Sequence, residues 1–387
     1  MAIVGAGPAG TSLAIRLAEQ DFPVVLIERE KFPRHKLCGE FISPECLPHF
    51  ESLGVLDTML SRGGDHITET RFYEPGGRHV IVPSKWFGQQ GYALSLSRAE
   101  MDLRLLARAR SVGVEVLEET AVVDVFGSSD EINAVKTRDR NGGTSEVSAD
   151  LFIDATGRSR ILSKLIEKKT RNGQLKRKAA KPILVGFKTH LRNVNLEKGR
   201  CEIYFFRGGY GGLSCVENGL ANHCFLARAK TVREFNGNTD KLVEEVIFKN
   251  KRAALTLKDA VPVREWLAVS IDSFGIKELN PAANLFSVGD SAAFIDPFTG
   301  SGMLMAFESS QILADCVAEY GFAFEKIAGQ YQKQYKLRFT RRLRICSLLR
   351  RAAFVPHLAK LAISALRLSE SSRQFLVRST RPQPDSN

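Results

Sequence analysis

The chain has 387 residues, of which 44% are hydrophobic and 25% charged, and its formal net charge is +12. These proportions exclude a disordered or fibrous protein, and the length can hold one large core or two joined domains. The longest apolar runs are too short to cross a bilayer, and no signal-peptide pattern opens the chain. The seven cysteines are scattered and odd in number, which disfavours a disulfide framework or a cysteine-based zinc site, so we expect a cytoplasmic protein.

The first thirty residues contain a strand–turn–helix–strand pattern. An apolar run at 2–4 leads into a glycine-rich turn and a helical pattern, and a second apolar run at 24–27 ends in Glu28. The three glycines of the turn are Gly5, Gly7 and Gly10. They permit, in order, a tight turn, close approach of a pyrophosphate and close packing of helix on strand. Only four residues precede the first glycine, so either the first strand is short or the natural chain begins further upstream.

This pattern predicts a dinucleotide site. The unpaired N–H groups and the dipole of the helix start favour phosphates. Glu28 lies near the offset expected for a carboxylate that accepts hydrogen bonds from ribose hydroxyls. Its charge disfavours a 2′-phosphate at this position, which leaves NAD and FAD as the alternatives.

Two later segments decide between them. LFIDATGRSRIL, at 151–162, is an apolar strand followed by Ala-Thr-Gly. The second, at 284–315, is a strand ending in Gly289-Asp290, then a loop with Pro297 and a glycine-bearing helix start. Together with the first turn, this order resembles the FAD enzymes of the para-hydroxybenzoate hydroxylase fold. The resemblance implies an α/β (α+β) chain with a Rossmann-type FAD-binding domain, an interleaved antiparallel substrate-binding sheet and a C-terminal helical region.

The resemblance also implies roles for individual residues. Asp290 would accept from ribityl or ribose hydroxyls, and N–H groups at Gly300 and Gly302 would meet the N1–O2 edge of the flavin. Ser97 and Glu100 form a capping-box pattern, and Arg98 beside them either contacts the cofactor or is a surface arginine. The predicted FAD-binding residues are Gly5, Ala6, Gly7, Pro8, Ala9, Gly10, Glu28, Arg29, Lys36, Cys38, Gly39, Arg98, Val122, Ala155, Gly157, Gly289, Asp290, Pro297, Gly300, Gly302 and Met303.

The intervening segments predict how the domains interleave. Segments 121–126, 132–138 and 145–153 alternate apolar and polar residues, which predicts an antiparallel meander. The polar, basic stretch 168–181 predicts an exposed connection or lid. We expect three regions: an FAD domain at 1–65, 92–180 and 280–320; a substrate sheet at 66–91 and 181–279; and a helical region at 321–387.

No second strand–glycine turn–helix unit occurs, since GGYGG at 208–212 lies between predicted strands. A nicotinamide donor, NAD(P)H, would therefore bind only transiently.

The loop PRHKLCGEF, at 33–41, resembles the Lys-x-Cys-Gly loop of geranylgeranyl reductases, which in that family passes close to the flavin. Cys38 is thus either a small side chain lining the flavin site, a redox or proton-relay group, or a packing residue. YGGLSCVENGLANHCFLA, at 210–227, resembles that family's sheet segment behind the substrate pocket. Tyr210 either points its phenol into the pocket or is a turn residue. Gly211-Gly212-Leu213 stand where true geranylgeranyl reductases often carry a tryptophan.

The leading interpretation is a geranylgeranyl-reductase-like enzyme that transfers hydride from reduced flavin to a small apolar, prenyl-type substrate. The alternatives are a monooxygenase that hydroxylates an aromatic or polyketide substrate, and a flavin-binding protein without catalysis. Trp86 and Trp266 do not form the W-x-W-x-I-P signature of flavin halogenases, and no Gly-x-Ser-x-Gly supports hydrolysis.

The run KLRFTRRLRICSLLRR, at 336–351, is strongly basic. It predicts either a patch for anionic lipid, an acidic carrier or nucleic acid, or a solvated helix face. Nucleic acid is disfavoured because no recognised binding module accompanies the charge. Peripheral membrane contact through this helix is the partner interaction that we expect.

Overall fold

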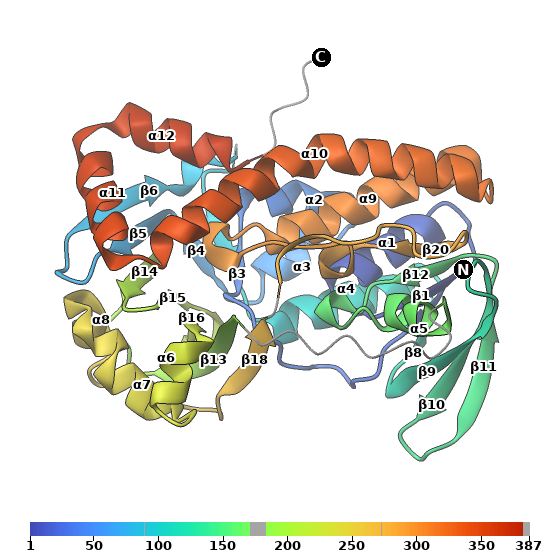
Figure 1. Cartoon of the computed structure of the whole chain (residues 1–387), viewed down its shortest axis with the longest axis horizontal. Coiled ribbons are helices and arrows are strands. Elements are labelled where there is room, and N and C mark those ends of the chain that lie inside the picture. Colours follow the sequence, from blue (N-terminus) through green and yellow to red (C-terminus); the bar gives the residue numbers. More distant parts are fainter. Residues whose placement is uncertain (89, 171–182, 272, 382–387) are drawn as a thin grey trace.

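The computed structural model describes residues 1–88, 90–170, 183–271 and 273–381. A five-stranded parallel sheet in the order β20-β12-β1-β2-β8 lies toward the right in Figure 1. The strands are β1 (Ala2–Val4), β2 (Val25–Ile27), β8 (Glu115–Leu117), β12 (Phe152–Asp154) and β20 (Leu285–Ser287). Strand β1 has three residues in this chain.

Alternate residues of these strands face two apolar clusters. Ile3 and Ile153 pack toward the helices α1 (Pro8–Ala18), α4 (Arg98–Ser111) and α9 (Gly302–Tyr320). Val4 and Phe152 pack on the opposite face, toward the antiparallel meander. Both faces are therefore covered, which explains why the strands read as continuous apolar runs rather than alternating ones.

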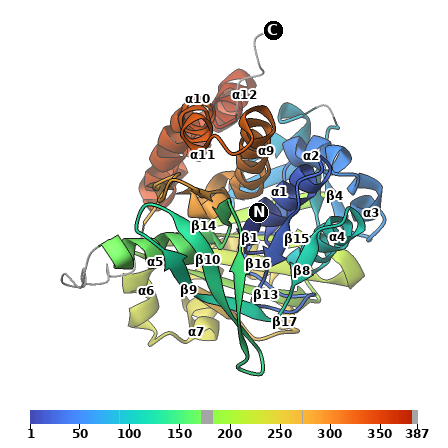
Figure 2. The ribbon, with the colours of Figure 1, turned by 90° about the vertical axis from the view of Figure 1, so that its right-hand side faces the viewer.

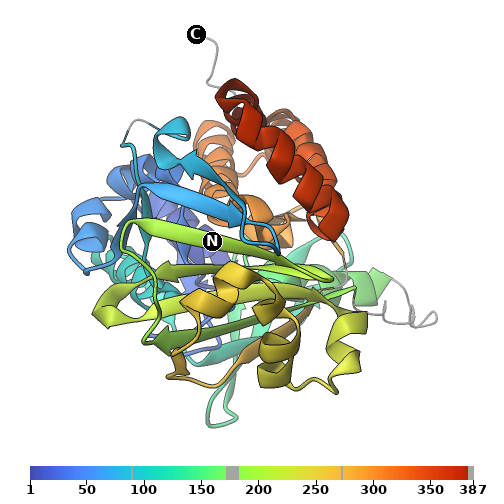
Figure 3. The ribbon, with the colours of Figure 1, turned by 90° about the vertical axis from the view of Figure 1, so that its left-hand side faces the viewer.

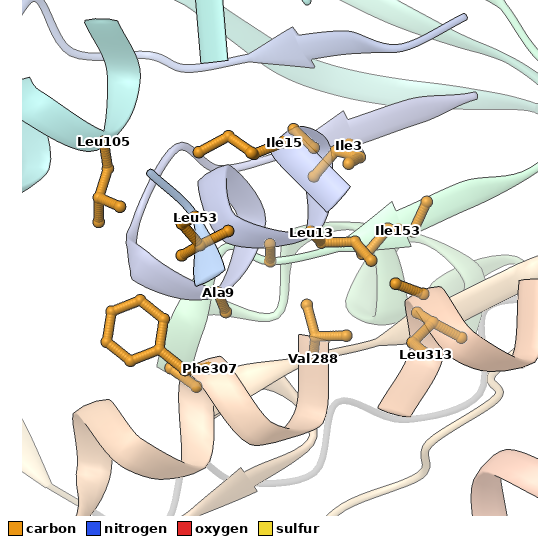
Figure 4. Close-up of a cluster of buried hydrophobic side chains, with 14 of the residues drawn as sticks. Ile3, Ala9, Leu13, Ile15, Leu53, Leu105, Ile153, Val288, Phe307 and Leu313 are labelled. Atoms are coloured by element: carbon orange, nitrogen blue, oxygen red, sulfur yellow. The ribbon is translucent and has the colours of Figure 1, made fainter. Parts of the chain in front are cut away.

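Helix α1 lies between the parallel sheet and α9. Figure 4 shows Ala9 and Leu13 of α1 facing Val288, Phe307 and Leu313 from the C-terminal part of the chain. The small side chain of Ala9 lets the helices approach closely. The start of α1, where the predicted site begins, is thus fixed by residues almost 300 positions away.

The meander consists of β9 (Thr120–Gly127), β10 (Ile132–Asp139) and β11 (Thr144–Ser148), in the order β11-β10-β9. It projects from the molecule beside α5 (Ile161–Thr170) (Figures 1 and 2). The meander prediction is confirmed, but the third segment is broken, because β11 ends at Ser148 and the next strand, β12, joins the parallel sheet. The basic stretch predicted at 168–181 lies outside the described residues from position 171 onward.

A second, larger sheet has eight strands. Its order is β17-β13-β16-β15-β14-β5-β6, with β18 also paired to β13 (Figure 3). The strands are β5 (Glu69–Tyr73), β6 (His79–Pro83), β13 (Leu184–Arg192), β14 (Arg200–Phe206), β15 (Gly209–Cys215), β16 (Ala221–Arg228), β17 (Val261–Pro262) and β18 (Leu267–Ile271). The hairpin of β5 and β6 joins this sheet through parallel pairing of β5 with β14.

The segment GGYGG was predicted between strands, and that prediction is wrong. Gly209 to Gly212 lie inside β15, paired on both sides. A Cβ added to Gly211 would lie 2.7 Å from the Cβ of Phe225 on β16. The glycines here make room for neighbouring side chains in a crowded sheet, so the residue type that usually marks a turn misled the prediction.

Shorter elements complete the fold. Helices α6 (Ala229–Glu234), α7 (Thr239–Glu245) and α8 (Lys251–Thr256) lie in the chain between β16 and β17 of the larger sheet. The first part of the chain adds α2 (Leu47–Ser52), α3 (Leu56–Leu60) and a small sheet of β3 (Phe41–Ile42), β7 (Ala93–Ser95) and β4 (Asp65–Ile67). Strands β19 (Gly275–Ile276) and β21 (Ala293–Phe294) form a two-stranded pair.

From residue 302 the described chain is helical, as predicted. After α9 come α10 (Phe324–Ala353), α11 (Pro356–Leu368) and α12 (Glu370–Ser379) (Figure 1). Helix α10 packs on the core through Tyr331, Tyr335 and Phe339, which recur every four residues and are fully buried. None of the helices in the described residues combines the length and apolar character needed to span a bilayer.

The basic run on α10 is divided between inside and outside. Arg338 and Arg342 form ion pairs with Glu308 of α9, at 2.8 and 3.2 Å, and Arg350 lies 3.6 Å from Asp296. Arg341 and Arg344 are exposed. Neither a uniform patch nor a uniformly solvated face describes this helix.

Candidate active site

The turn between β1 and α1 has the geometry expected of a dinucleotide-binding loop. Gly5 has a φ of +103°, and a Cβ there would lie 2.4 Å from the carbonyl oxygen of Ala155. A Cβ on Gly10 would lie 2.0 Å from the carbonyl oxygen of Gly5. On Gly7 the nearest atom would be Nη2 of Arg98, at 3.9 Å. The first and third glycines are therefore required by the protein itself, whereas the second leaves space for a ligand.

The other two motifs meet this turn. Gly289, with a φ of +58°, lies against α1, because a Cβ there would approach the Cβ of Ala9 to 2.8 Å. A Cβ on Gly157 would lie 4.0 Å from the Cβ of Asp290. The Ser291 hydroxyl donates to Asp154 and to the carbonyl of Gly157, at 3.2 and 2.9 Å. Segments around positions 5, 155 and 290 thus form one continuous site.

A row of alternating charges lies along one side of the site. The Glu28 carboxylate is buried, accepts from the backbone N–H of Ala6 at 2.9 Å and pairs with Arg34 at 3.3 Å. Arg34 also pairs with Asp102 at 3.2 Å, and Asp102 receives two hydrogen bonds from Arg98, at 2.8 and 2.7 Å. Arg98 is therefore not a surface arginine, and its contact with the cofactor stays a prediction.

Arg34 and Asp102 were not among the predicted residues. The i,i+4 spacing of Arg98 and Asp102 on one helix could have indicated their pair. Nothing in the sequence marks Arg34 as the partner of Glu28.

The residues present fit FAD. At the N-terminus of α1 the buried hydroxyl of Thr11 has no hydrogen-bond partner within the described part of the chain. Arg98 reaches the open side of Gly7, so the helix start and one guanidinium are available to a pyrophosphate. Desolvation raises the pKa of Asp290 to about 6, although Arg158 and Arg98 act against this. A carboxylate in such surroundings is stabilised by donors such as the hydroxyls of a ribityl or ribose group.

The Gly300 turn faces the loop that contains Cys38. Gly300 has a φ of +61°, and a Cβ there would lie 3.1 Å from the ring of Phe41. Gly302 begins α9, and the buried Met303 follows it. Pro297, in the preceding single turn, is exposed. The first N–H groups of α9 are thus placed beside a loop from the first domain segment, which suits the predicted contact with a flavin edge.

Arg29 and Val122 were predicted to bind FAD, but within the described residues neither takes part in the contacts of this site. The Arg29 side chain is 59% exposed and pairs with its neighbour Glu30. Val122 packs in the apolar cluster between the parallel sheet and the meander.

Cys38 lies in a loop that bridges the parallel-sheet part and the larger sheet. Its side chain is half-buried, and its sulfur accepts from the backbone N–H of Glu40 at 3.4 Å. Its carbonyl accepts from the Asn222 amide of β16 at 3.1 Å, and the Lys36 carbonyl accepts from Lys188 of β13 at 3.0 Å. At Gly39 an added Cβ would meet nothing within 4 Å. The loop is therefore fixed at both sides of the cysteine and open beside it.

A buried charged cluster supports this loop. The Glu40 carboxylate is fully buried, forms an ion pair with Lys188 and lies 2.7 Å from Nε2 of His190. The carboxylate also accepts a hydrogen bond from the backbone N–H of Arg98, at 2.8 Å. Burial alone would raise the pKa of Glu40, but the hydrogen bond from His190 and the charge of Lys188 outweigh it and lower the pKa. The His35 ring packs edge-on against His190, and burial together with nearby cations lowers its pKa to about 4.

Sequence reasoning missed this cluster. Glu40 is separated from Lys188 and His190 by 148 and 150 positions, and no spacing pattern connects them.

Tyr210 is a buried strand residue of β15, so its alternative as a turn residue is wrong. Its hydroxyl donates to Asp296 at 2.7 Å, and burial raises its pKa well above the ordinary value. The ring packs edge-on against Phe298 and Phe354. The phenol therefore points from the larger sheet toward the loop that precedes Gly300.

Comparisons with known proteins agree with this geometry. A family model described as an FAD binding domain matches residues 1–334. The chain is 26% identical over 342 residues to the flavin-dependent halogenase armH3 of Armillaria mellea, covering 82% of this chain and 66% of that protein. It is 26% identical over 343 residues to menaquinone reductase of Mycolicibacterium smegmatis, covering 82% and 76%. It is also 26% identical over 349 residues to digeranylgeranylglycerophospholipid reductase 1 of Methanosphaera stadtmanae, covering 87% and 80%.

Solved structures share the fold. The flavin-dependent brominase Bmp2 superposes with a TM-score of 0.79 at 16% identity, over 98% of this chain and 92% of that one. A geranylgeranyl bacteriochlorophyll reductase-like protein from Thermoplasma acidophilum gives 0.79 at 20% identity, over 98% and 94%. The chain spans 66% of the length of armH3 and 65% of the length of a tryptophan 2-halogenase of Chondromyces crocatus.

Proposed function

The chain belongs to the FAD binding domain family of flavoprotein oxidoreductases and monooxygenases, and from this premise we propose that it reduces a small apolar, prenyl-type substrate. The observation that carries the proposal is the Cys38 loop, which the larger sheet and the backbone N–H of Arg98 hold in place beside the site. We also propose NAD(P)H as a donor that binds transiently.

The chemistry divides between cofactor and chain. Bound FAD supplies the hydride. A double bond that accepts a hydride also needs a proton, and the Cys38 thiol is the candidate donor. Solvent then returns the proton to the sulfur. The Glu40 cluster acts as a positioning group, because it fixes the backbone next to the thiol.

An apolar substrate is supported by the aromatic side chains on the larger sheet. Phe72 and Phe205 pack with Phe298, and Tyr210 packs against the same ring. These side chains come from both the sheet and the loop before Gly300. The two relatives named as reductases support the same choice.

Anaerobic reoxidation tests the proposal. The FAD-loaded protein is reduced with dithionite, and prenyl alkenes or prenyl quinones are added while the flavin absorbance is followed. We expect reoxidation without oxygen, with a product that has gained two hydrogens by mass spectrometry. Cys38→Ser should slow this step about a hundredfold. Cys215→Ser is the matched control, since Cys215 is also half-buried but lies at the far end of β15.

A second candidate is an oxygen-dependent monooxygenase or halogenase. It is favoured by the flavin-dependent halogenase that matches at the same 26% identity. Reoxidation only in oxygen, with a hydroxylated or halogenated product, would establish it and reject the reductase. If no acceptor reoxidises the flavin faster than buffer does, the protein binds flavin without catalysis.

A further inference from the structure

The C-terminal helices carry the most exposed large apolar side chains of the described residues. These are Leu337, Leu348, Leu361, Leu368 and Phe375, with exposed fractions of 76%, 64%, 66%, 89% and 74%. Scattered exposed leucines are ordinary on a protein surface, but a concentration on one group of helices indicates a binding surface. Helices α10 to α12 lie along the outside of the molecule (Figures 1 and 3).

The exposed residues follow helical spacing. On α10, Leu337, Arg341, Arg344 and Leu348 recur every three or four residues and are all exposed. They therefore share one face, opposite the buried Phe339 and Arg342.

On α11, Leu358, Leu361 and Leu368 form a second such face. The buried Ala359 and Ile363 hold the other side of that helix against the protein. The exposed surface of α11 therefore carries leucines as well as the basic side chains of Lys360 and Arg367.

The charged residues of this region are almost all basic. From Lys336 to Arg381, Glu370 is the only acidic residue of the sequence. The exposed basic side chains have no ion-pair partner within the described residues, unlike Arg338 and Arg350, which pair inward. These exposed side chains are Lys336, Arg341, Arg344, Lys360, Arg367 and Arg378.

We propose that this C-terminal surface, made of those five apolar and six basic side chains, binds an anionic phospholipid bilayer. Leucines of a surface-lying helix enter the acyl boundary, while lysines and arginines meet the headgroup phosphates. A second copy of this chain would bring the same positive charges opposite one another, and nucleic acid would leave the leucines in water. The inference is independent of the reaction that the flavin site performs.

Vesicle flotation of the full chain tests the inference. The probes are vesicles of phosphatidylcholine, alone or mixed with phosphatidylglycerol. We expect at least about tenfold more protein on the anionic vesicles, and less binding at high salt. Two double variants should each abolish the preference for anionic over neutral vesicles. The first is Leu361→Glu with Leu368→Glu, and the second is Arg341→Glu with Arg344→Glu. Because all four residues are exposed, the thermal midpoint and flavin spectrum should remain unchanged.

Leu255→Glu is the matched control, since Leu255 is 60% exposed but lies on α8, outside this surface. It should bind vesicles like the natural sequence. Equal binding to both vesicle types, no binding at all, or loss of binding in the control would overturn the proposal. So would light scattering that shows a dimer dissociated by the leucine substitutions, because a second copy would then cover the surface.

Discussion

Asp290 ends the late strand–turn motif with a carboxyl group whose pKa burial raises to about 6. The folded protein therefore holds this proton more tightly than the unfolded chain does. The resulting stability is present below the ordinary pKa near 4 and is lost as the pH rises through 6. At neutral pH the ionised Asp290 therefore lowers the free energy of unfolding of the flavin-free protein.

Asp290→Asn should thus stabilise the flavin-free protein at pH 8 by about 2 kcal/mol and weaken FAD binding. Urea unfolding at pH 8 and pH 4, with titration of FAD, measures both effects. The gain should disappear at pH 4, where the natural carboxyl is protonated. An equal gain at both pH values would show that ionisation is not its cause.

Residues whose function depends on local backbone geometry could be read from the sequence. Gly5 and Gly10 have the tight turn and the close packing that their spacing predicts, whereas the pyrophosphate contact of Gly7 stays a prediction. The pairing of Glu40 with Lys188 and His190 could not be read, because it depends on how two sheets are placed relative to each other.

At the scale of one element, the β1–α1 turn separates structural from ligand-binding glycines. Gly10→Ala places a methyl group against backbone at 2.0 Å and should destabilise the flavin-free protein by about 3 kcal/mol. Gly7→Ala meets no protein atom closer than 3.9 Å, and Gly7 has ordinary extended backbone. It should leave stability unchanged and weaken FAD binding about a hundredfold. Chemical denaturation and flavin titration of both variants measure the difference, and equal destabilisation would contradict it.

The contact between α9 and α10 depends on a buried ion pair. Glu308 pairs with Arg342, whose side chain is 1% exposed, so Glu308→Gln leaves a cation unpaired in the interior. We expect a loss of about 3–5 kcal/mol in the free energy of unfolding. Arg341→Gln, one residue earlier but exposed, should change it by less than about 0.5 kcal/mol. Denaturant unfolding of the two variants compares them directly, and similar values would mean that the pair contributes little.

The same helix shows why a charge run is hard to interpret from sequence. The run 336–351 was expected to be either a lipid patch or a solvated face. Three of its arginines turn inward because Glu308 and Asp296, from elements nearer the middle of the fold, lie beneath them. Helical spacing alone could separate the two faces, but not reveal which face has acidic partners.

For the whole molecule, acid is expected to weaken the fold through three buried or half-buried histidines that are uncharged at neutral pH. Desolvation lowers the pKa of His35, His49 and His223 to about 4, and these residues lie in a loop, in α2 and in β16. As the pH falls below 6.5 the unfolded chain takes up these protons first. Each contribution is therefore complete above about pH 6.5 and is lost by about pH 4.

His223→Gln should recover about 2–3 kcal/mol of the stability that the natural sequence loses between pH 7 and pH 4. Urea unfolding across this range measures the slope. His66→Gln is the control, because His66 is exposed. Identical slopes for the natural sequence and His223→Gln would show that acid acts elsewhere.

The order of strands in the parallel sheet has a consequence for synthesis. β1 is made first, but its neighbour β12 comes 150 residues later, and β20, which closes the far edge, ends at Ser287. While the ribosome makes the intervening polypeptide, β1 can pair only with β2, and its other edge and its apolar side chains stay exposed to water. Folding of the nucleotide-binding half is therefore expected to wait until most of the chain has emerged, and the growing polypeptide is a natural client for chaperones during that interval.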